Sequence, residues 1–262
     1  MIYTAYRLYK ASLTSAKYAK KVFRQALVSR ETATFTYNLT PQNESYLLNL
    51  TAQILKTDAA LVEQYFNELK DNQKFKRSIV QNLSTSNLRK KKDKRCDFGN
   101  KLALYAIVRI MKPSVVVENG VEVGFTSVVL CEALRRNKEE GCDGKFIGID
   151  INPAAGHLIK VDTRYDSLWE MKYADAVDCL NILDEKIDFY FSDGYRSYAY
   201  EQAEFAALAN KISHKAIVIT NKATFSKALL ELSKQLKKTY SFFKEHPANH
   251  WYEGSGVGFM HG

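Results

Sequence analysis

An alternation of short apolar runs with helix-forming segments limits the fold of this chain more than any other feature of its sequence. From Ser114 onward the apolar runs read as buried strands, and most are followed by apolar residues at helical spacing. The predicted strands are 114–118, 145–150, 168–175, 187–193 and 215–221. Strands that alternate with helices indicate a parallel sheet covered on both faces.

The two ends of the chain depart from this alternation. Thr40 followed by proline is a helix-start signal, and the apolar spacing after it predicts that the first third is helical. At the other end, residues 239–245 and 254–261 read as two strands that pair without an intervening helix. We therefore expect a helical extension over residues 1–95 and a sheet domain over residues 96–262.

Composition allows one large α/β domain with an extension and argues against a membrane-spanning chain. Hydrophobic residues make up 46% of the 262 residues, enough to supply a core, and no run approaches the roughly 18 apolar residues of a span. No secretion signal is recognisable, and the four cysteines show no metal-ligand spacing. These features predict reduced thiols and a cytoplasmic location.

The net charge of +9 is concentrated in two segments outside the predicted sheet. Residues 1–30 hold seven Lys or Arg and no acid, and residues 89–95 read RKKKDKR. The first segment could lie as a helix on a membrane surface, act as an organelle transit peptide or pack on the domain as a solvated arm, and its weak apolar stripe favours the arm. The second is predicted to be an exposed loop, because it lacks the interleaved aromatic residues of a nucleic-acid site.

A glycine turn links the first predicted strand to the next helix. VVVENGVEVG places Gly120 and Gly124 after the apolar run, and Thr126 or Ser127 is predicted to cap the helix. Glycines allow a ligand to approach the backbone, although the same pattern also occurs as plain turn chemistry. The GxGxxG spacing of dinucleotide sites is missing, and Glu122 would repel a diphosphate, so a cofactor without phosphates fits better.

Polar residues occur at the carboxyl ends of the predicted strands, where ligands of open α/β sheets bind. They are Glu118, Asp150, Asp175, Asp193 and Asn221. Asp150 is placed to accept hydrogen bonds from a ribose, and Asp175 could accept from an adenine amine. Each has a structural alternative: a turn before Asn-Pro for Asp150, a helix N-cap for Asp175 and an Asp-Gly turn for Asp193.

Residues 97–262 resemble the class I S-adenosylmethionine-dependent methyltransferases, and within them a branch of small-molecule O-methyltransferase-like proteins. The marks are the glycine turn and the stretches IDINPAAG (149–156), DGYRSY (193–198) and HWYEGSGVG (250–258). The resemblance implies a Rossmann-like methyltransferase fold, with a mostly parallel seven-stranded sheet, an antiparallel C-terminal strand pair and a helical N-terminal extension.

The same resemblance implies S-adenosyl-L-methionine as the cofactor and O-methylation of a small molecule, a sugar or a secondary metabolite. The implied cofactor-binding residues are Glu118, Gly120, Gly124, Asp150, Asp175 and Asp193. In relatives that use a divalent metal, an Asp after strand four and an Asp-Asn pair after strand five hold it. Here Asp193 and Asn221 are kept but Thr220 replaces the second Asp, so we expect weak Mg²⁺ binding and metal-independent transfer.

The implied catalytic residues are Asp193, Asn221, Arg196 and His250. Arg196 replaces the branch's histidine and cannot take up a proton at ordinary pH, so it is predicted to clamp an anionic acceptor. His250, with His246, is the remaining candidate base, and loop structure is its alternative reading. Trp251 and Tyr252 are candidates for the acceptor pocket or for the core.

Two further readings remain at this point. Thr220 and Arg196 suit a catalytically inactive methyltransferase-like binding or scaffold protein as well as an enzyme. The positive charge suggests a nucleic-acid methyltransferase, but no NPPY-like motif occurs, so nucleic acid is not the favoured partner. The sequence leaves the oligomeric state open, and a homo-oligomer is allowed.

Overall fold

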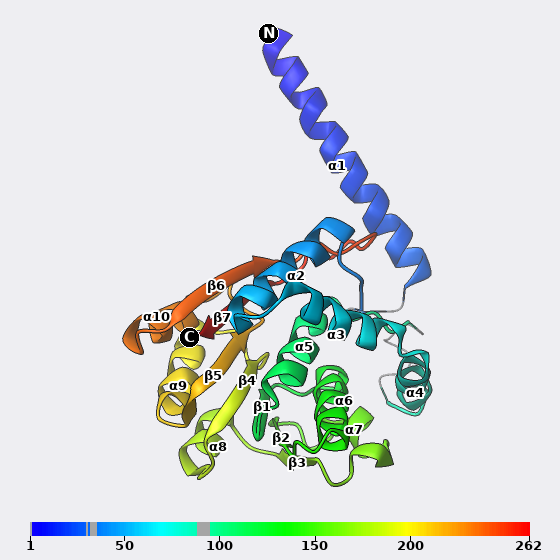
Figure 1. The fold of residues 1–262 in the computed structure, drawn as a ribbon. Helices are drawn as coiled ribbons and strands as arrows, with labels where there is room; N and C mark the ends of the chain where they lie inside the picture. The colour runs from blue at the N-terminus through cyan, green and yellow to red at the C-terminus, as the bar shows by residue number, and fades with distance from the viewer. Residues whose placement is uncertain (1, 30, 32–35, 88–94) are drawn as a thin grey trace.

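A seven-stranded sheet with the strand order β3-β2-β1-β4-β5-β7-β6 organises the computed structural model (Figure 1). The strands are β1 (Val115–Asn119), β2 (Lys145–Ile149), β3 (Trp169–Lys172), β4 (Ile187–Ser192), β5 (Ile212–Thr220), β6 (Thr239–Lys244) and β7 (Gly256–His261). β1 to β5 are parallel, and β7 runs antiparallel to both β5 and β6. The predicted Rossmann-like sheet with its antiparallel closing pair is confirmed.

The structure describes residues 2–29, 31, 36–87 and 95–262. The predicted exposed loop at 89–95 therefore lies outside the described residues, apart from Arg95. The strand order reverses between the adjacent strands β1 and β4: β2 and β3 follow β1 toward one edge of the sheet, and β5 follows β4 toward the other. This reversal is where an open α/β sheet forms a crevice for a ligand.

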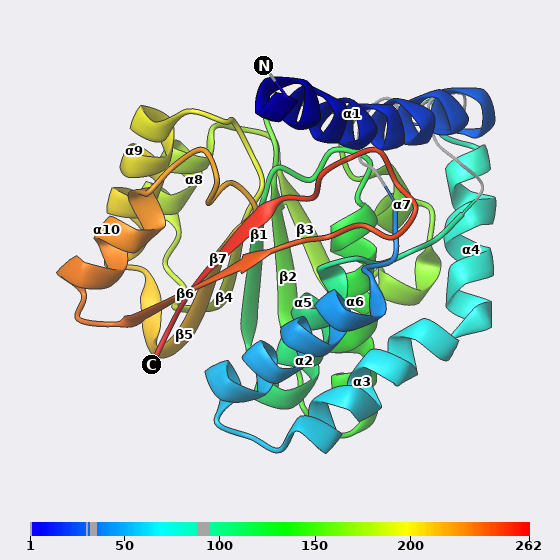
Figure 2. The same cartoon turned by 90° about the horizontal axis from the view of Figure 1, so that it is seen from above.

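Helices cover both faces of the sheet (Figure 2). On one face lie α2 (Pro41–Leu55), α3 (Ala59–Asp71), α4 (Gln73–Ser84), α5 (Lys101–Met111), α6 (Phe125–Glu139) and α7 (His157–Lys160), and on the other lie α8 (Ala176–Ile182), α9 (Tyr198–Ala209) and α10 (Ala228–Gln235). A 3₁₀ turn, Thr163–Tyr165, follows α7. Side chains of β1 alternate between the two cores: Val116 points to the first, and Val115 and Val117 to the second.

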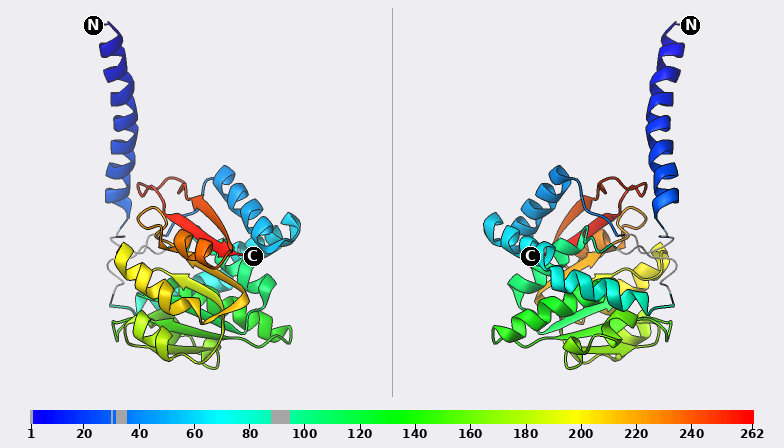
Figure 3. Two further views of the ribbon diagram at one scale, coloured as in Figure 1. Left: turned by 90° about the vertical axis from the view of Figure 1, so that its left-hand side faces the viewer. Right: turned by 90° about the vertical axis from the view of Figure 1, so that its right-hand side faces the viewer.

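The predicted N-terminal extension consists of two structurally different parts. Leu47 of α2, Phe66 of α3 and Phe75 of α4 are fully buried in the same core as the sheet. In contrast, α1 (Ile2–Val28) projects from the body of the protein (Figures 1 and 3), and its described side chains are exposed. The expectation that this basic segment packs on the domain is therefore wrong, because its apolar side is narrower than the stripe of about 100° that packing on a core needs and contains Lys20.

Candidate active site

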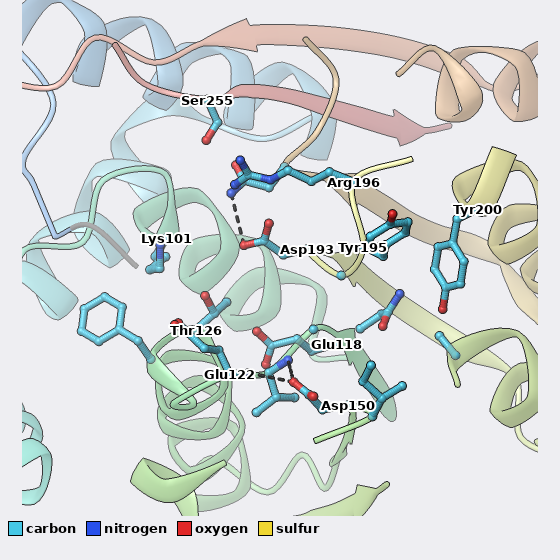
Figure 4. A pocket seen from close by; sticks show the side chains of 18 of the residues that line it. Lys101, Glu118, Glu122, Thr126, Asp150, Asp193, Tyr195, Arg196, Tyr200 and Ser255 are labelled. Atoms are coloured by element: carbon cyan, nitrogen blue, oxygen red, sulfur yellow. Dashed lines mark hydrogen bonds between the residues drawn. The ribbon is translucent and has the colours of Figure 1, made fainter. Parts of the chain in front are cut away.

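A cavity of about 700 Å³ opens at the carboxyl ends of the parallel strands (Figure 4). This volume is in the range of small-molecule and cofactor sites. All the strand-end residues singled out in the sequence line it: Glu118, Asp150, Asp175, Asp193 and Asn221. The predicted convergence of these side chains is observed, while the role of each one stays a prediction.

The glycine turn is clamped between the ends of β2 and β4. Gly120 N donates to Ile149 O at 2.9 Å, and Asp193 N donates to Asn119 O at 2.8 Å. Gly120 has a φ of +88°, and a Cβ atom there would lie 2.6 Å from the backbone of Asp193. Only glycine can therefore occupy this position without moving the end of β4.

Asp150 fastens the glycine turn to the end of β2. Its Oδ2 accepts hydrogen bonds from Val121 N at 3.0 Å and Glu122 N at 2.9 Å, while Oδ1 accepts from Asn152 N at 2.8 Å. The turn before Asn-Pro is thus real, and Asp150 also shapes the cavity wall. A carboxylate has about four acceptor positions, so capacity for a ligand hydroxyl remains.

Asp175 combines a structural role with a place in the cavity wall. Its Oδ1 accepts from Val177 N at 2.8 Å and caps α8, as the alternative reading expected. Its Oδ2 accepts from the hydroxyl of Tyr200 at 2.9 Å, and Tyr200 lines the cavity too. This side of the cavity therefore presents an aromatic ring beside a carboxylate, a combination that suits a flat polar ring.

Gly124, the second glycine of the turn, has a packing role outside the cavity lining. Gly124 is not among the residues that line the cavity; it is the N-cap of α6, with a φ of +89°. A Cβ atom there would lie 3.4 Å from the Cα of Gly156, so Gly124 permits close packing against the IDINPAAG stretch. Neither Thr126 nor Ser127 caps α6, contrary to the prediction, because the helix begins at Phe125 and both lie inside its first turn.

Burial keeps Glu118 at the end of β1 protonated near neutral pH. Removal from solvent is the main cause that raises the pKa of Glu118 to about 8. A hydrogen bond from Ser127 acts in the other direction, because it favours the charged form. The carboxylates of Asp193 and Asp150 raise the pKa of Glu118 further, and the ammonium of Lys101 lowers it. A positively charged ligand in the cavity would favour ionisation of this side chain.

The raised pKa of Glu118 predicts that stability falls as pH rises. The folded protein holds a proton on Glu118 that the unfolded chain, with a pKa near 4.5, releases, so this contribution is complete below that value and is lost as pH rises through about 8. Between about pH 5 and pH 9, the free energy of unfolding of the Glu118→Gln variant should fall by up to about 4 kcal/mol less than that of the wild type. Urea titrations measure this difference.

The matched control for this titration is Glu63→Gln, on an exposed position of α3. It should keep the wild-type pH dependence. If Glu118→Gln also kept it, Glu118 would be ionised in the folded protein across this range.

Asp193, which follows β4, is held by two consecutive side-chain hydrogen bonds that start at Asn100, the N-cap of α5. Asn100 Nδ2 donates to Asn221 Oδ1 at 3.1 Å, and Asn221 Nδ2 donates to Asp193 Oδ2 at 3.3 Å. Burial raises the pKa of Asp193, while nearby Lys101 and Arg196 lower it. Asp193 therefore presents a fixed carboxyl group whose proton affinity is increased, as a proton acceptor requires.

The position where metal-using relatives carry a second Asp is built differently here. Thr220 is buried and donates through Oγ1 to Glu201 Oε1 at 2.7 Å, and it does not line the cavity. Lys222, also buried, lies 3.5 Å from Glu201 Oε1 and donates to Tyr195 O at 3.3 Å. Thr220, Glu201 and Lys222 do not fit a divalent cation, because the ammonium group of Lys222 already provides the positive charge beside the Glu201 carboxylate.

The part of the cavity away from the glycine turn is formed around Glu245. Its carboxylate accepts from Tyr37 Oη at 2.8 Å, Asn100 N at 3.0 Å and Ser255 N at 3.1 Å, and it is fully buried. Tyr37, Asn100 and Ser255 all line the cavity. A segment ahead of α2, the start of α5 and the loop before β7 are thereby joined into one wall.

Carboxyl side chains gather at one end of the cavity, and Arg196 lies at the other with Asp193 next to it. Figure 4 shows Glu118, Glu122 and Asp150 at one end, and Arg196 with Ser255 at the other. Arg196 is predicted to clamp an anionic acceptor, and it lies at the end that suits this role. Its guanidinium is 5.7 Å from the centre of the Phe225 ring, which limits where the charge can lie.

His250 is outside the cavity lining, which argues against its predicted role as the base. It is 4% exposed, its Nδ1 accepts from Tyr252 N at 2.9 Å, and its Nε2 lies 3.5 Å from Glu31 Oε2. His250 thus holds the loop before β7, as the alternative reading expected. Tyr252 lines the cavity, whereas Trp251 and His246 do not.

A family model decides what kind of domain this is. Residues 117–221 match a model described as a methyltransferase domain. The chain contains a methyltransferase domain. The match runs from β1 to the residue after β5, and thus includes every strand end that lines the cavity. The predicted resemblance to class I S-adenosylmethionine-dependent methyltransferases is confirmed by this match and by the order of the strands.

Solved methyltransferases are similar to this chain at low sequence identity. A Podospora anserina methyltransferase bound to S-adenosylhomocysteine is 15% identical, with a TM-score of 0.49 and coverage of 78% of this chain and 94% of that one. An O-methyltransferase of Streptomyces achromogenes, from tomaymycin synthesis and in complex with S-adenosylmethionine, is 17% identical, with a TM-score of 0.46 and coverage of 85% and 99%. None of the curated proteins compared with the chain matches it.

Sequence reasoning missed several residues that line the methyltransferase cavity. They are Tyr37, Asn100, Lys101, Tyr200 and Ser255. None of them stands at the carboxyl end of a parallel strand, so the rule that found the acidic residues could not find these. Asn100 and Lys101 at the start of a helix read in the sequence as a helix boundary only.

Proposed function

We propose that this protein is an S-adenosylmethionine-dependent methyltransferase that methylates a hydroxyl oxygen of a small, negatively charged acceptor without a metal ion. The observation that carries the proposal is the cavity beside the glycine turn, with carboxyl side chains at one end and Arg196 at the other. Similar solved methyltransferases contain S-adenosylmethionine or its demethylated product, which agrees with the choice of cofactor.

The residues at the acidic end fit this cofactor. S-adenosylmethionine has no phosphate and carries positive charge on its sulfonium and amino groups, so Glu122 in the turn does not oppose it. Asp150 has acceptor capacity for ribose hydroxyls, and Asp175 beside Tyr200 could receive the adenine. When bound, the cofactor supplies a methyl group on a positively charged sulfur.

Asp193 is the residue that we assign to proton transfer. It lines the cavity between the two ends, is fixed by Asn221 and has a raised pKa. It takes the proton that the acceptor hydroxyl loses as that oxygen is methylated. Arg196 and Lys101 hold the negative charge of the acceptor, and fixed positions of this kind can supply much of the rate of a methyl transfer.

A methyl-transfer assay with labelled S-adenosylmethionine tests the proposal. We expect turnover with small hydroxylated carboxylates or phosphates, little with neutral alcohols, and a rate that changes less than about twofold when Mg²⁺ is replaced by a chelator. Arg196→Gln should raise KM for the anionic acceptors about tenfold and leave kcat nearly unchanged.

Arg77→Gln, on an exposed position of α4, removes the same charge far from the cavity and should leave KM unchanged. Loss of turnover with the chelator would show that a metal takes part. Equal use of neutral and anionic acceptors by wild type and Arg196→Gln would remove the assigned role of Arg196.

A further inference from the structure

Helix α1 contacts little of the protein from which it projects. Its 27 residues extend for about 40 Å at 1.5 Å per residue. Exposed large apolar side chains on it include Tyr3 at 83%, Phe23 at 69% and Leu27 at 71%. Helices in proteins gain most of their stability from packing an apolar face. We therefore expect the exposed apolar side chains of α1 to contact a surface outside this domain.

The exposed apolar and basic side chains of α1 are concentrated on adjoining sides of the helix. At 100° per residue, Tyr9, Leu13, Phe23 and Leu27 fall within about 80° of one another on one side. The basic side chains are centred about 90° away on one flank of that side, and Lys20 lies within it, where its aliphatic stem can follow the apolar side chains. They are Arg7, Lys10, Lys17, Lys20, Lys21 and Arg24. The sequence of α1 contains no Asp or Glu.

A surface that is both negatively charged and able to take up apolar side chains fits a helix whose apolar side is flanked by basic residues. We propose that α1 binds in the plane of a lipid bilayer that contains anionic headgroups. Its apolar side enters the boundary between headgroups and acyl chains, Tyr6 lies at the edge of that side, and the basic side chains on the flank contact the headgroups. The helix lies on the membrane, because no described helix is long and apolar enough to cross it.

Two other occupants fit the helix less well. A second copy of α1 would bring two sets of basic side chains together without acidic partners, and like charges at a helix interface are destabilising. A nucleic acid would contact the basic side but leave Phe23 and Leu27 in water. Charge and apolar area together therefore favour an anionic bilayer.

The junction after α1 lies beside the candidate active site. Glu31 is buried and lies 3.5 Å from His250 in the loop before β7, and Tyr37 lines the cavity. A bilayer bound by α1 would therefore lie near the loop that borders the acceptor end. This inference is independent of the proposed function, since membrane binding by α1 requires neither cofactor nor turnover.

Sedimentation of the full chain with lipid vesicles tests the proposal. We expect binding to vesicles of phosphatidylcholine with phosphatidylserine, and at least about tenfold weaker binding to phosphatidylcholine alone. Replacing Lys17, Lys20, Lys21 and Arg24 by Gln should weaken binding to the anionic vesicles at least about tenfold. Phe23→Ser with Leu27→Ser should weaken it to a similar extent, which simple charge attraction does not predict.

The control removes equal charge from exposed positions of the body: Lys74, Lys215, Lys234 and Lys237, each to Gln. It should bind anionic vesicles within about twofold of wild type. The proposal is overturned if wild type fails to bind anionic vesicles, if the control loses binding as much as the α1 variants do, or if light scattering shows a dimer that dissociates when Phe23 and Leu27 are replaced.

Discussion

Replacing Gly120 by Ala should displace the end of β4 and destabilise the domain. The added Cβ atom would lie 2.6 Å from the carbonyl carbon and oxygen of Asp193, at a φ of +88°. Left-handed strain of about 1 to 2 kcal/mol and overpacking of about 1 to 3 kcal/mol add to a loss near 4 kcal/mol. Thermal unfolding should show a fall in Tm of about 10 °C, and binding of S-adenosylhomocysteine should be lost.

Gly141→Ala is the matched control for this substitution. Gly141 has a φ of +83°, but a Cβ atom there would meet no atom within 4 Å. It should lower stability only by the backbone strain of about 1 to 2 kcal/mol and leave ligand binding intact. Equal losses in the two variants would mean that the contact between the glycine turn and the end of β4 has no special importance.

Replacing Asp193 by Asn should reduce kcat by about 10² to 10⁴ while the protein stays folded, because the amide cannot take up the proton of the acceptor hydroxyl. Affinity for S-adenosylhomocysteine should change less than about threefold, since Asn keeps the shape of the side chain and can still contact Asn221. Single-turnover methyl transfer and a binding titration separate the two effects. The wild-type rate should rise with pH as the carboxylate forms, with a midpoint above the ordinary value of 3.8, because burial raises the pKa of Asp193.

Asp188→Asn is the control, at the opposite end of the same strand. Asp188 accepts hydrogen bonds from Ser114 N and Val115 N and lies outside the cavity lining. Its kcat should match the wild type. A fall in kcat of less than about threefold in Asp193→Asn would assign proton transfer to another group or to water.

The sheet could be predicted from sequence because its signal is local. Apolar runs such as the one before Gly120 and the alternation with helices are visible along the chain, and the strand-end rule then brings Asp150, Asp175 and Asp193 to one edge. The boundaries were less accurate: β5 begins at Ile212, earlier than predicted. The sequence alone could not show that Gly124 serves packing, because the contact with Gly156 is formed across the fold.

The acceptor end could not be predicted because its parts meet only in three dimensions. Tyr37 and Ser255 are separated by most of the chain and are joined through the buried carboxylate of Glu245. His250 was expected at the site from a motif, but the fold turns it toward Glu31 instead. The sequence could show Thr220 at the position where a metal-binding Asp was expected, whereas it could not show the buried ammonium of Lys222 beside Glu201.

Calorimetric titration of the wild-type protein with S-adenosylhomocysteine tests the central claim, that the strand ends form one nucleoside site, most directly. We predict saturable binding of one ligand per chain, lost in Gly120→Ala and retained in Gly141→Ala. Absence of heat and of any thermal shift at about 1 mM ligand, with a protein shown to be folded, would contradict it.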